Sequence, residues 1–250
     1  MITDLKNKNI IIFGATSGIG QELSLFLNKF GANLILIARD KIKLNVLTKK
    51  IKKKVFSLIC DFNNHEEIKN TFDKIRKISI KVDGLVYLGG THLIKPISLT
   101  ELKDLDSLLK INFIAPYLIL KEFNSNFLRS KMSSVVLITS ISAIAGQTAL
   151  SAYASTKGAI ISLTKSAAIE MVRNKIRVNC IAPGHLEGTK MSNETRSLLT
   201  DDQYNNLVSS HPLGIGKPID VCNCIAYLLS DSSKWITGSV IKIDGGFSIG

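Results

Sequence analysis

Short apolar runs alternate with longer segments of helical spacing from one end of the chain to the other. The runs Asn9–Phe13 and Asn33–Ala38 are apolar and of strand length, and the segments that follow them, Gln21–Phe30 and Lys41–Lys54, carry apolar residues at helical intervals. Strands that alternate with helices pair into a parallel sheet with helices packed against it. The pattern therefore predicts an α/β fold with a doubly wound, mainly parallel sheet and helices on both of its faces.

The alternating pattern shows no internal boundary. A chain of 250 residues with 45% hydrophobic residues can bury a full core, and it fits one large α/β domain as well as two small ones. No linker rich in Pro, Gly or Ser, no internal repeat and no long low-complexity segment divides the sequence. We therefore predict one domain over residues 1–250.

One polar stretch departs from the pattern. Residues 185–212 are expected to form a substrate loop, because Glu187–Pro212 is polar, is interrupted by Gly188 and lies between the sixth strand and a helix that begins near Pro218. Such a segment is typical of a mobile lid over a bound substrate. The alternative interpretation is an ordinary surface excursion.

Composition excludes several classes of protein. No apolar run reaches the length of a membrane span, and Met1–Lys8 lacks the apolar core of a signal peptide. The four cysteines at positions 60, 180, 222 and 224 match neither a zinc-ligand set nor a redox C-x-x-C, and the four histidines are scattered without metal-ligand spacing. We expect a cytoplasmic protein with buried thiols, no metal site and no membrane association.

The formal net charge of +12 raises the question of nucleic-acid binding. The densest basic stretch is Lys41–Lys54, which we interpret as an amphipathic helix with Ile42, Val46 and Leu47 toward the core and lysines toward solvent. No aromatic residues interleave with these lysines as a stacking platform requires, so we expect no nucleic-acid partner. The positive potential still favours an anionic cofactor or substrate.

A glycine-rich turn follows the first strand at once, in the sequence Gly14-Ala-Thr-Ser-Gly-Ile-Gly20. Glycine permits the sharp turn and a close backbone approach, and the free N–H groups at the helix start hold a pyrophosphate. The alternative is tight packing of strand against helix, but the strand, turn and helix context favours a dinucleotide. The predicted cofactor-binding residues of this turn are Gly14, Ser17, Gly18, Ile19 and Gly20.

The second strand ends at Arg39, where a dinucleotide fold places the residue that reads the adenosine ribose. An acid at this position selects NAD by binding the 2′-hydroxyl, whereas an arginine suits the 2′-phosphate of NADP. Arg39 therefore predicts that NADP(H) is preferred over NAD(H). The neighbouring Asp40 weakens this inference, and the alternative is a surface arginine.

A candidate proton donor lies downstream. Tyr153 and Lys157 are four residues apart in a predicted helix, so both side chains share one face, where the lysine cation is expected to lower the pKa of the phenol. Ser140, at the end of the apolar strand Val135–Thr139, is placed to donate a second hydrogen bond to a substrate carbonyl oxygen. Together with the dinucleotide site, this trio predicts hydride transfer with Tyr153 as the general acid.

The same four-residue spacing recurs at Tyr117 and Lys121. This pair lies in a predicted helix, Asn112–Lys121, and no strand-end serine precedes it at short distance. We interpret it as a packed tyrosine beside a solvated lysine.

Over essentially its whole length the chain resembles the short-chain dehydrogenase/reductase family, and within it the 3-oxoacyl-[acyl-carrier-protein] reductases. The glycine turn, Ser140, Tyr153 and Lys157 match family motifs, and Asn112 matches the structural and catalytic asparagine. The resemblance implies a Rossmann fold, a lysine that also binds the nicotinamide ribose, and an asparagine that holds a water in a proton relay. It further implies cofactor contacts at Asp61, Phe62, Gly89, Tyr153, Lys157, Pro183 and Gly184.

Three positions depart from the family pattern. Phe13 replaces a threonine before the first glycine, so packing must substitute for a lost hydrogen bond. Leu88, in Val86–Gly90, stands where the family has an asparagine that bonds neighbouring backbone. The family's threonine after Pro183-Gly184 would fall near Gly188, whereas the threonine here is Thr189, so a contact to the cofactor carboxamide is in doubt.

The prediction that follows is an NADPH-dependent carbonyl reductase, with a 3-oxoacyl thioester on acyl carrier protein as the first candidate substrate. A dehydrogenase or reductase of a sugar or another small secondary alcohol is the alternative. A noncatalytic nucleotide-binding scaffold is a third possibility, against which the four intact catalytic positions speak. The resemblance also implies a homotetramer formed by the helices around Asn112–Leu128 and Ala152–Arg173 and by the C-terminal strand.

Overall fold

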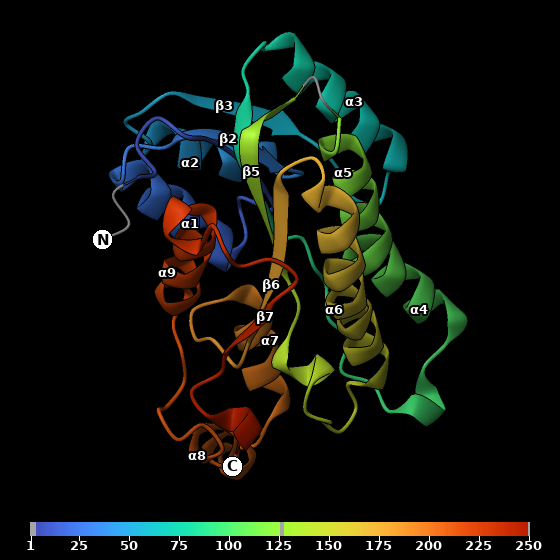
Figure 1. Cartoon of the computed structure of the whole chain (residues 1–250). Helices are drawn as coiled ribbons and strands as arrows, with labels where there is room; N and C mark the ends of the chain where they lie inside the picture. Colours follow the sequence, from blue (N-terminus) through green and yellow to red (C-terminus); the bar gives the residue numbers. More distant parts are fainter. Residues whose placement is uncertain (1–3, 126–127, 250) are drawn as a thin grey trace.

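The computed structural model describes residues 4–125 and 128–249, and its centre is a seven-stranded sheet in the order β3-β2-β1-β4-β5-β6-β7 (Figure 1). All six pairings between neighbouring strands are parallel. The strands are β1 Asn9–Phe13, β2 Asn33–Ala38, β3 Val55–Ile59, β4 Val82–Tyr87, β5 Arg129–Ile138, β6 Ile176–Pro183 and β7 Val240–Ile243. The predicted doubly wound, parallel Rossmann fold is confirmed.

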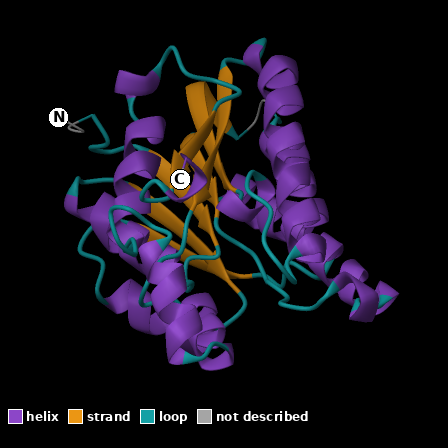
Figure 2. Ribbon diagram, turned by 90° about the horizontal axis from the view of Figure 1, so that it is seen from below, coloured by secondary structure: helices purple, strands orange, loops and turns teal. Residues whose placement is uncertain are grey.

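Helices cover both faces of the sheet, which lies between two helical layers in Figure 2. One face is covered by α1 Gly18–Lys29, α2 Lys41–Lys49 and α9 Pro218–Leu229. The other face is covered by α3 His65–Lys77, α5 Ala115–Phe123 and α6 Ser151–Val172, and α4 Leu102–Leu109 packs against α6 outside them. Two further helices, α7 Lys190–Leu198 and α8 Asp201–Ser209, follow β6, and short helical turns are found at Ile97–Leu99, Lys110–Ile114, Ile141–Ala143, Asp231–Ser233 and Phe247–Ile249.

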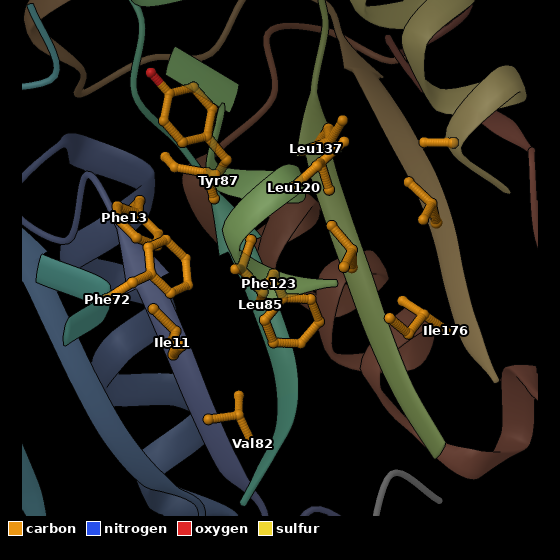
Figure 3. Close-up of a cluster of buried hydrophobic side chains, with 14 of the residues drawn as sticks. Ile11, Phe13, Phe72, Val82, Leu85, Tyr87, Leu120, Phe123, Leu137 and Ile176 are labelled. Atoms are coloured by element: carbon orange, nitrogen blue, oxygen red, sulfur yellow. The ribbon is translucent and has the colours of Figure 1, made fainter. Parts of the chain in front are cut away.

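The core consists of two apolar clusters, one on each face of the sheet. Alternate residues of a strand point to opposite faces, so in β1 Ile11 and Phe13 enter one cluster while Ile10 and Ile12 enter the other. The first cluster, drawn in Figure 3, packs α3, α5 and α6 against the sheet. Burial on both faces explains why the central strands are continuous apolar runs in the sequence.

Side-chain caps mark the start of several helices. The Ser17 hydroxyl accepts a hydrogen bond from the Gly20 N–H (3.0 Å) at the start of α1, and the Asp40 carboxylate accepts one from the Lys43 N–H (3.0 Å) at the start of α2. Thr189 and Thr200 form capping boxes at α7 and α8. The polar stretch predicted as a lid is therefore largely helical, which its composition alone did not indicate.

Two details of the sequence interpretation are wrong. In α2, Leu44 and Leu47 are buried, whereas Ile42 is 78% exposed and Val46 53% exposed, because the side of the helix that carries Leu44 and Leu47 faces the sheet. The predicted burial of Ile42 and Val46 therefore fails.

The second correction concerns the pair Tyr117 and Lys121. Tyr117 is 52% exposed instead of packed, because α5 buries Ala115, Ile119, Leu120 and Phe123 and turns this residue outward. Lys121 is exposed as predicted. The helix expected over Asn112–Leu128 ends at Phe123 in the structure, and positions 126 and 127 lie outside the described residues. Among the helices of the described residues, none combines the length and apolar character needed to cross a membrane.

Candidate active site

A cleft of about 840 Å³ lies at the carboxyl ends of the parallel strands, the edge where open α/β sheets bind their ligands. Its walls are formed by the turns that follow β1 to β6 and by residues of α7 and α8. Almost all the predicted site residues line it, namely Gly14, Ser17, Gly18, Ile19, Arg39, Asp61, Phe62, Gly89, Ser140, Tyr153, Lys157, Pro183 and Gly184. Gly20 and Asn112 are buried behind the wall.

The glycine turn has the shape of a phosphate cradle. Gly14 adopts a φ of 83°, and a Cβ there would lie 2.9 Å from the Gly89 nitrogen, so the turn after β1 and the end of β4 approach as backbone against backbone. A Cβ on Gly20 would lie 2.3 Å from the Gly14 carbonyl oxygen. Gly18 and Ile19, in the first turn of α1, line the cleft, and the N–H groups of a first helical turn have no acceptor within their own helix. These residues fit the pyrophosphate of a dinucleotide.

Packing replaces the hydrogen bond that Phe13 cannot make. Its ring centroid lies 5.7 Å from that of Phe72, 5.9 Å from Phe62 and 6.4 Å from Tyr87. The turn is also held by backbone, because the Gly14 N–H donates to the Ile37 carbonyl at 2.8 Å. The expectation that packing substitutes at this position agrees with the structure.

Leu88 keeps the strand end in place through its backbone. Its N–H donates to the Phe13 carbonyl at 2.9 Å, and its side chain is buried in the apolar cluster of α1 and α9. The loop beyond it passes close to the catalytic lysine, since a Cβ on Gly90 would lie 3.4 Å from Lys157 Nζ. In this chain, backbone bonding and apolar packing of Leu88 therefore hold the start of this loop.

At the far end of the cleft, Arg39 is exposed on the rim, and among the described residues no ion pair involves it. Asp40, which weakened the cofactor prediction, is occupied elsewhere, because it caps α2 and lies 3.8 Å from Lys43 Nζ. Asp61 accepts two hydrogen bonds from Asn63, and Phe62 packs on Tyr87 with centroids 5.6 Å apart. The guanidinium is thus available to a ligand in the cleft.

Ser140, Tyr153 and Lys157 come together on one wall. Ser140 follows β5, and Tyr153 and Lys157 lie one turn apart in the first half of α6. The Thr139 hydroxyl donates to the Lys157 carbonyl at 2.6 Å and so fixes α6 against the end of β5. Lys157 Nζ donates to the Ile138 carbonyl at 3.1 Å and lies 5.8 Å from the centroid of the Tyr153 ring.

Burial controls the protonation of both groups. It raises the pKa of Tyr153 to about 12, and the hydrogen bond with Ser140 offsets only part of this rise. Burial also lowers the pKa of Lys157 to about 8. The pKa of the tyrosine is therefore raised and not lowered as expected, because desolvation of the phenolate is the largest effect.

Asn112 lies in a π-helical turn, Lys110–Ile114, between α4 and α5. Its side-chain amide donates to the Thr91 carbonyl (2.9 Å) and to the Thr156 hydroxyl (3.0 Å), and its oxygen accepts from the Thr91 N–H (3.0 Å). The side chain therefore joins the loop after β4 to α6 and does not line the cleft. Turns of this kind are frequent at functional sites.

His92 was not singled out in the sequence. Its ring meets that of Tyr153 edge-on at 6.4 Å, its Nδ1 lies 3.6 Å from the Glu194 carboxylate on α7, and burial lowers its pKa. The available signal was its position, three residues beyond Gly89 in the loop that follows β4. His92 thus lies between Tyr153 and α7 and contacts both.

Thr189, the threonine one position beyond the place expected from the family pattern, has a structural role. Its hydroxyl caps α7 by accepting from the Ser192 N–H at 3.0 Å, and a Cβ on Gly18 would lie 3.1 Å from its methyl group. The residue therefore contacts the glycine turn through its methyl group while its oxygen belongs to α7. Among the described residues, no group of three His, Cys, Asp or Glu side chains is placed to hold a metal ion.

The fold and the site together define an oxidoreductase of the carbonyl reductase class: a parallel sheet, a glycine turn, and a serine, a tyrosine and a lysine on one wall of the cleft. The chain belongs to the short-chain dehydrogenase/reductase family. A family model described as enoyl-(acyl carrier protein) reductase matches residues 14–248. The chain is similar to the 3-oxoacyl-[acyl-carrier-protein] reductase FabG of Thermotoga maritima, with 31% identity over 249 residues, 98% of this chain and 99% of that protein. It is 30% identical to FabG of Rickettsia felis over 244 residues, 97% of this chain and 98% of that protein.

The same family is seen among solved structures. A short-chain dehydrogenase/reductase of Brucella melitensis, described as a glucose/ribitol dehydrogenase, matches with a TM-score of 0.91 and 25% identity, and the match covers 99% of both chains. Together these matches confirm the resemblance that the sequence motifs carried. Members of this family use NAD(P).

Proposed function

We propose that this protein reduces a ketone to a secondary alcohol with NADPH. The observation that carries the proposal is the convergence of Ser140, Tyr153 and Lys157 on one wall of a cleft that begins at the glycine turn. Two hydroxyl groups beside a buried amine suit a carbonyl oxygen that gains negative charge and then a proton. Residues 1–250 act in this proposal as one catalytic domain.

When bound, the nicotinamide supplies the hydride. The Ser140 and Tyr153 hydroxyls hold the carbonyl oxygen, and Tyr153 transfers its proton to that oxygen. Because burial keeps the pKa of this phenol near 12, the proton is present at neutral pH, as the reducing direction requires. Lys157, whose pKa is near 8, carries its charge at neutral pH and stabilises the phenolate that remains.

Residues of four regions would hold the cofactor. The glycine turn Gly14–Gly20 receives the pyrophosphate, Arg39 the 2′-phosphate, and Asp61 and Phe62 the adenine end. On the nicotinamide side lie Pro183 and Gly184 after β6. The cleft is lined continuously by residues from Arg39 to Tyr153, which supports this assignment.

For the substrate we propose a 3-oxoacyl thioester carried on acyl carrier protein. The FabG relatives carry this activity in their names, and a formal net charge of +12 suits an acidic carrier. The segment 185–212, with α7 and α8, covers the substrate end of the cleft. A sugar or another small secondary alcohol is the second candidate, supported by the description of the Brucella structure.

The proposal is tested by following NADPH oxidation with a matched panel of ketones. The panel contains an acetoacetyl group on acyl carrier protein, the same group on a short thiol, and a ketose. A kcat/KM highest for the carrier-bound thioester supports the first candidate, and one highest for the ketose supports the second. No oxidation with any ketone, together with binding of NADPH, would indicate a noncatalytic nucleotide-binding protein.

The cofactor preference is tested by charge reversal at Arg39. Hydrogen bonds to charged groups contribute about 1.5–3 kcal/mol, so Arg39→Asp is expected to raise the KM for NADPH by roughly ten- to a hundred-fold and to leave NADH unaffected or improved. Lys41→Asp is the matched control, because Lys41 is an exposed cation of the same region that does not line the cleft. A wild type that prefers NADH, with no change in Arg39→Asp, contradicts the assignment.

We also propose a homotetramer in the cytoplasm. Large apolar side chains are exposed on the helices expected to associate and before β7, namely Tyr117 on α5, Ile169 and Val172 on α6, and Trp235. Light scattering at micromolar concentration is expected to give about four times the 27.4 kDa mass of the chain. A monomer mass at that concentration contradicts this assembly.

A further inference from the structure

Tyr87, the last residue of β4, connects the sheet to the π-helical turn that carries Asn112. Its side chain is buried, and its hydroxyl donates to the Ile111 carbonyl at 2.6 Å. Figure 3 shows the hydroxyl at the edge of the apolar cluster, while the ring belongs to that cluster. Ile111 precedes Asn112 within the turn Lys110–Ile114.

The Ile111 carbonyl needs a partner from outside its helix. In this turn the Ala115 N–H bonds to the Lys110 carbonyl, five residues back. The same spacing would give the Ile111 carbonyl to residue 116, which is Pro116 and has no N–H. A backbone carbonyl withdrawn from solvent without a partner is unfavourable, and the Tyr87 hydroxyl gives this half-buried residue a donor.

The other side of Tyr87 faces the cofactor end of the cleft. Its ring packs on Phe62, which lines the cleft, with centroids 5.6 Å apart. A Cβ on Gly89, another lining residue, would lie 2.5 Å from the Tyr87 oxygen and 2.6 Å from its Cζ. Glycine at position 89 is therefore required by this tyrosine, and one side chain touches both the floor of the cleft and the π-helical turn.

From the turn, contacts continue to the catalytic lysine. The Asn112 amide donates to the hydroxyl of Thr156, the residue before Lys157 in α6. Asn112 also holds both backbone groups of Thr91, next to Gly90, at which a Cβ would lie 3.4 Å from Lys157 Nζ. A shift of the π-helical turn therefore displaces the groups on both sides of Lys157.

We propose that Tyr87 is a positioning residue, whose hydroxyl holds the π-helical turn so that Asn112 keeps Lys157 and Tyr153 aligned in the cleft. The catalytic part of this inference rests on the proposed reductase function, whereas the structural part does not. Burial raises the pKa of Tyr87 well above its usual value, so the hydroxyl keeps its proton at neutral pH.

The test starts from Tyr87→Phe, which keeps the ring and its contacts and removes only the hydroxyl. Amide hydrogen exchange is measured in peptides that span residues 110–118 and 154–160, and exchange in both is expected to become at least about tenfold faster. With a ketone substrate, kcat is expected to fall by about ten- to a hundred-fold while the KM for NADPH changes less than about twofold. The reason is that a misplaced catalytic group reduces the rate of the chemical step more than it reduces cofactor binding.

A control and a rescue variant sharpen the result. Ser134→Ala removes another buried hydroxyl that donates to a backbone carbonyl, that of Leu228 at 2.7 Å, away from the cleft. It is expected to leave exchange in both peptides and kcat unchanged. Adding Pro116→Ala to Tyr87→Phe supplies an N–H at residue 116, five residues beyond Ile111, and is expected to restore slow exchange and most of kcat.

The outcomes separate the two levels of the inference. Unchanged exchange in Tyr87→Phe, equal effects in Ser134→Ala, or a double variant without any rescue each overturns the proposed positioning by Tyr87. Faster exchange with an unchanged kcat overturns its effect on catalysis. If the wild type reduces no ketone, the reductase function fails, and the exchange measurements alone then decide whether Tyr87 holds the turn.

Discussion

Tyr153→Phe is expected to lower kcat for ketone reduction by about a hundred- to ten-thousand-fold, the usual cost of losing a general acid. The ring stays, so its edge-on contact with His92 and its burial at the start of α6 are retained. Only the proton donor is removed. The measurement is steady-state NADPH oxidation at saturating ketone, with the melting temperature recorded to show that the fold is intact.

Tyr117→Phe is the internal control for this experiment. It removes a hydroxyl from the second tyrosine that stands four residues before a lysine, but Tyr117 is half exposed on α5 and does not line the cleft. Its kcat is expected to equal that of the wild type. Equal losses in the two variants would show that Tyr153 is not the acid.

Lys157→Met is expected to separate activity from stability. Methionine keeps the length and apolar stem of lysine but carries no charge. Because one charged group that stabilises the transition state is lost, kcat for ketone reduction is expected to fall on the order of a hundred- to a thousand-fold. For the stability of the folded protein the charge is unfavourable, because burial lowers the pKa of this amine from its usual value of 10.5 to about 8. The charge that the reaction needs is thus disfavoured by folding.

The sign of the pH dependence follows from that lowered pKa. Between pH 8 and 10.5 the folded chain has released a proton that the unfolded chain still binds, so the free energy of unfolding rises with pH in this window. At about 1.4 kcal/mol for each pKa unit, the wild type should gain roughly 2–3 kcal/mol relative to Lys157→Met between pH 7 and pH 10. Urea unfolding of both proteins at the two pH values measures this difference. An equal change in the free energy of unfolding of the two proteins would contradict the lowered pKa of Lys157.

Much of the fold follows from local patterns that the structure preserves. The run Asn9–Phe13 and the turn Gly14–Gly20 specify a buried strand, a tight turn and a helix start through apolar side chains, glycine geometry and the Ser17 cap, all within a dozen residues. Such signals need no knowledge of the rest of the chain. The catalytic wall was found in the same way, because Tyr153 and Lys157 are one helical turn apart.

The features that the sequence did not predict depend on contacts between distant segments or on the whole fold. The exposure of Ile42 and Tyr117 is decided by which side of each helix meets the sheet, and apolar spacing alone leaves two choices. The two helices within 185–212 were hidden by their polar composition, although the Thr189 and Thr200 caps were present in the sequence. The high pKa of Tyr153 reflects burial by the whole fold, which no four-residue spacing reveals.

The order of the strands also bears on how the protein becomes active during folding. The cleft is built from the ends of strands that run from β1 near residue 9 to β6 near residue 183, and β1 pairs with both β2 and β4 at the centre of the sheet. Parallel pairing requires long crossover connections, so these contacts join residues far apart in the chain and form slowly. An emerging or partly folded chain can therefore contain the glycine turn long before Ser140 and Tyr153 reach it, and catalytic competence is a property of the completed sheet.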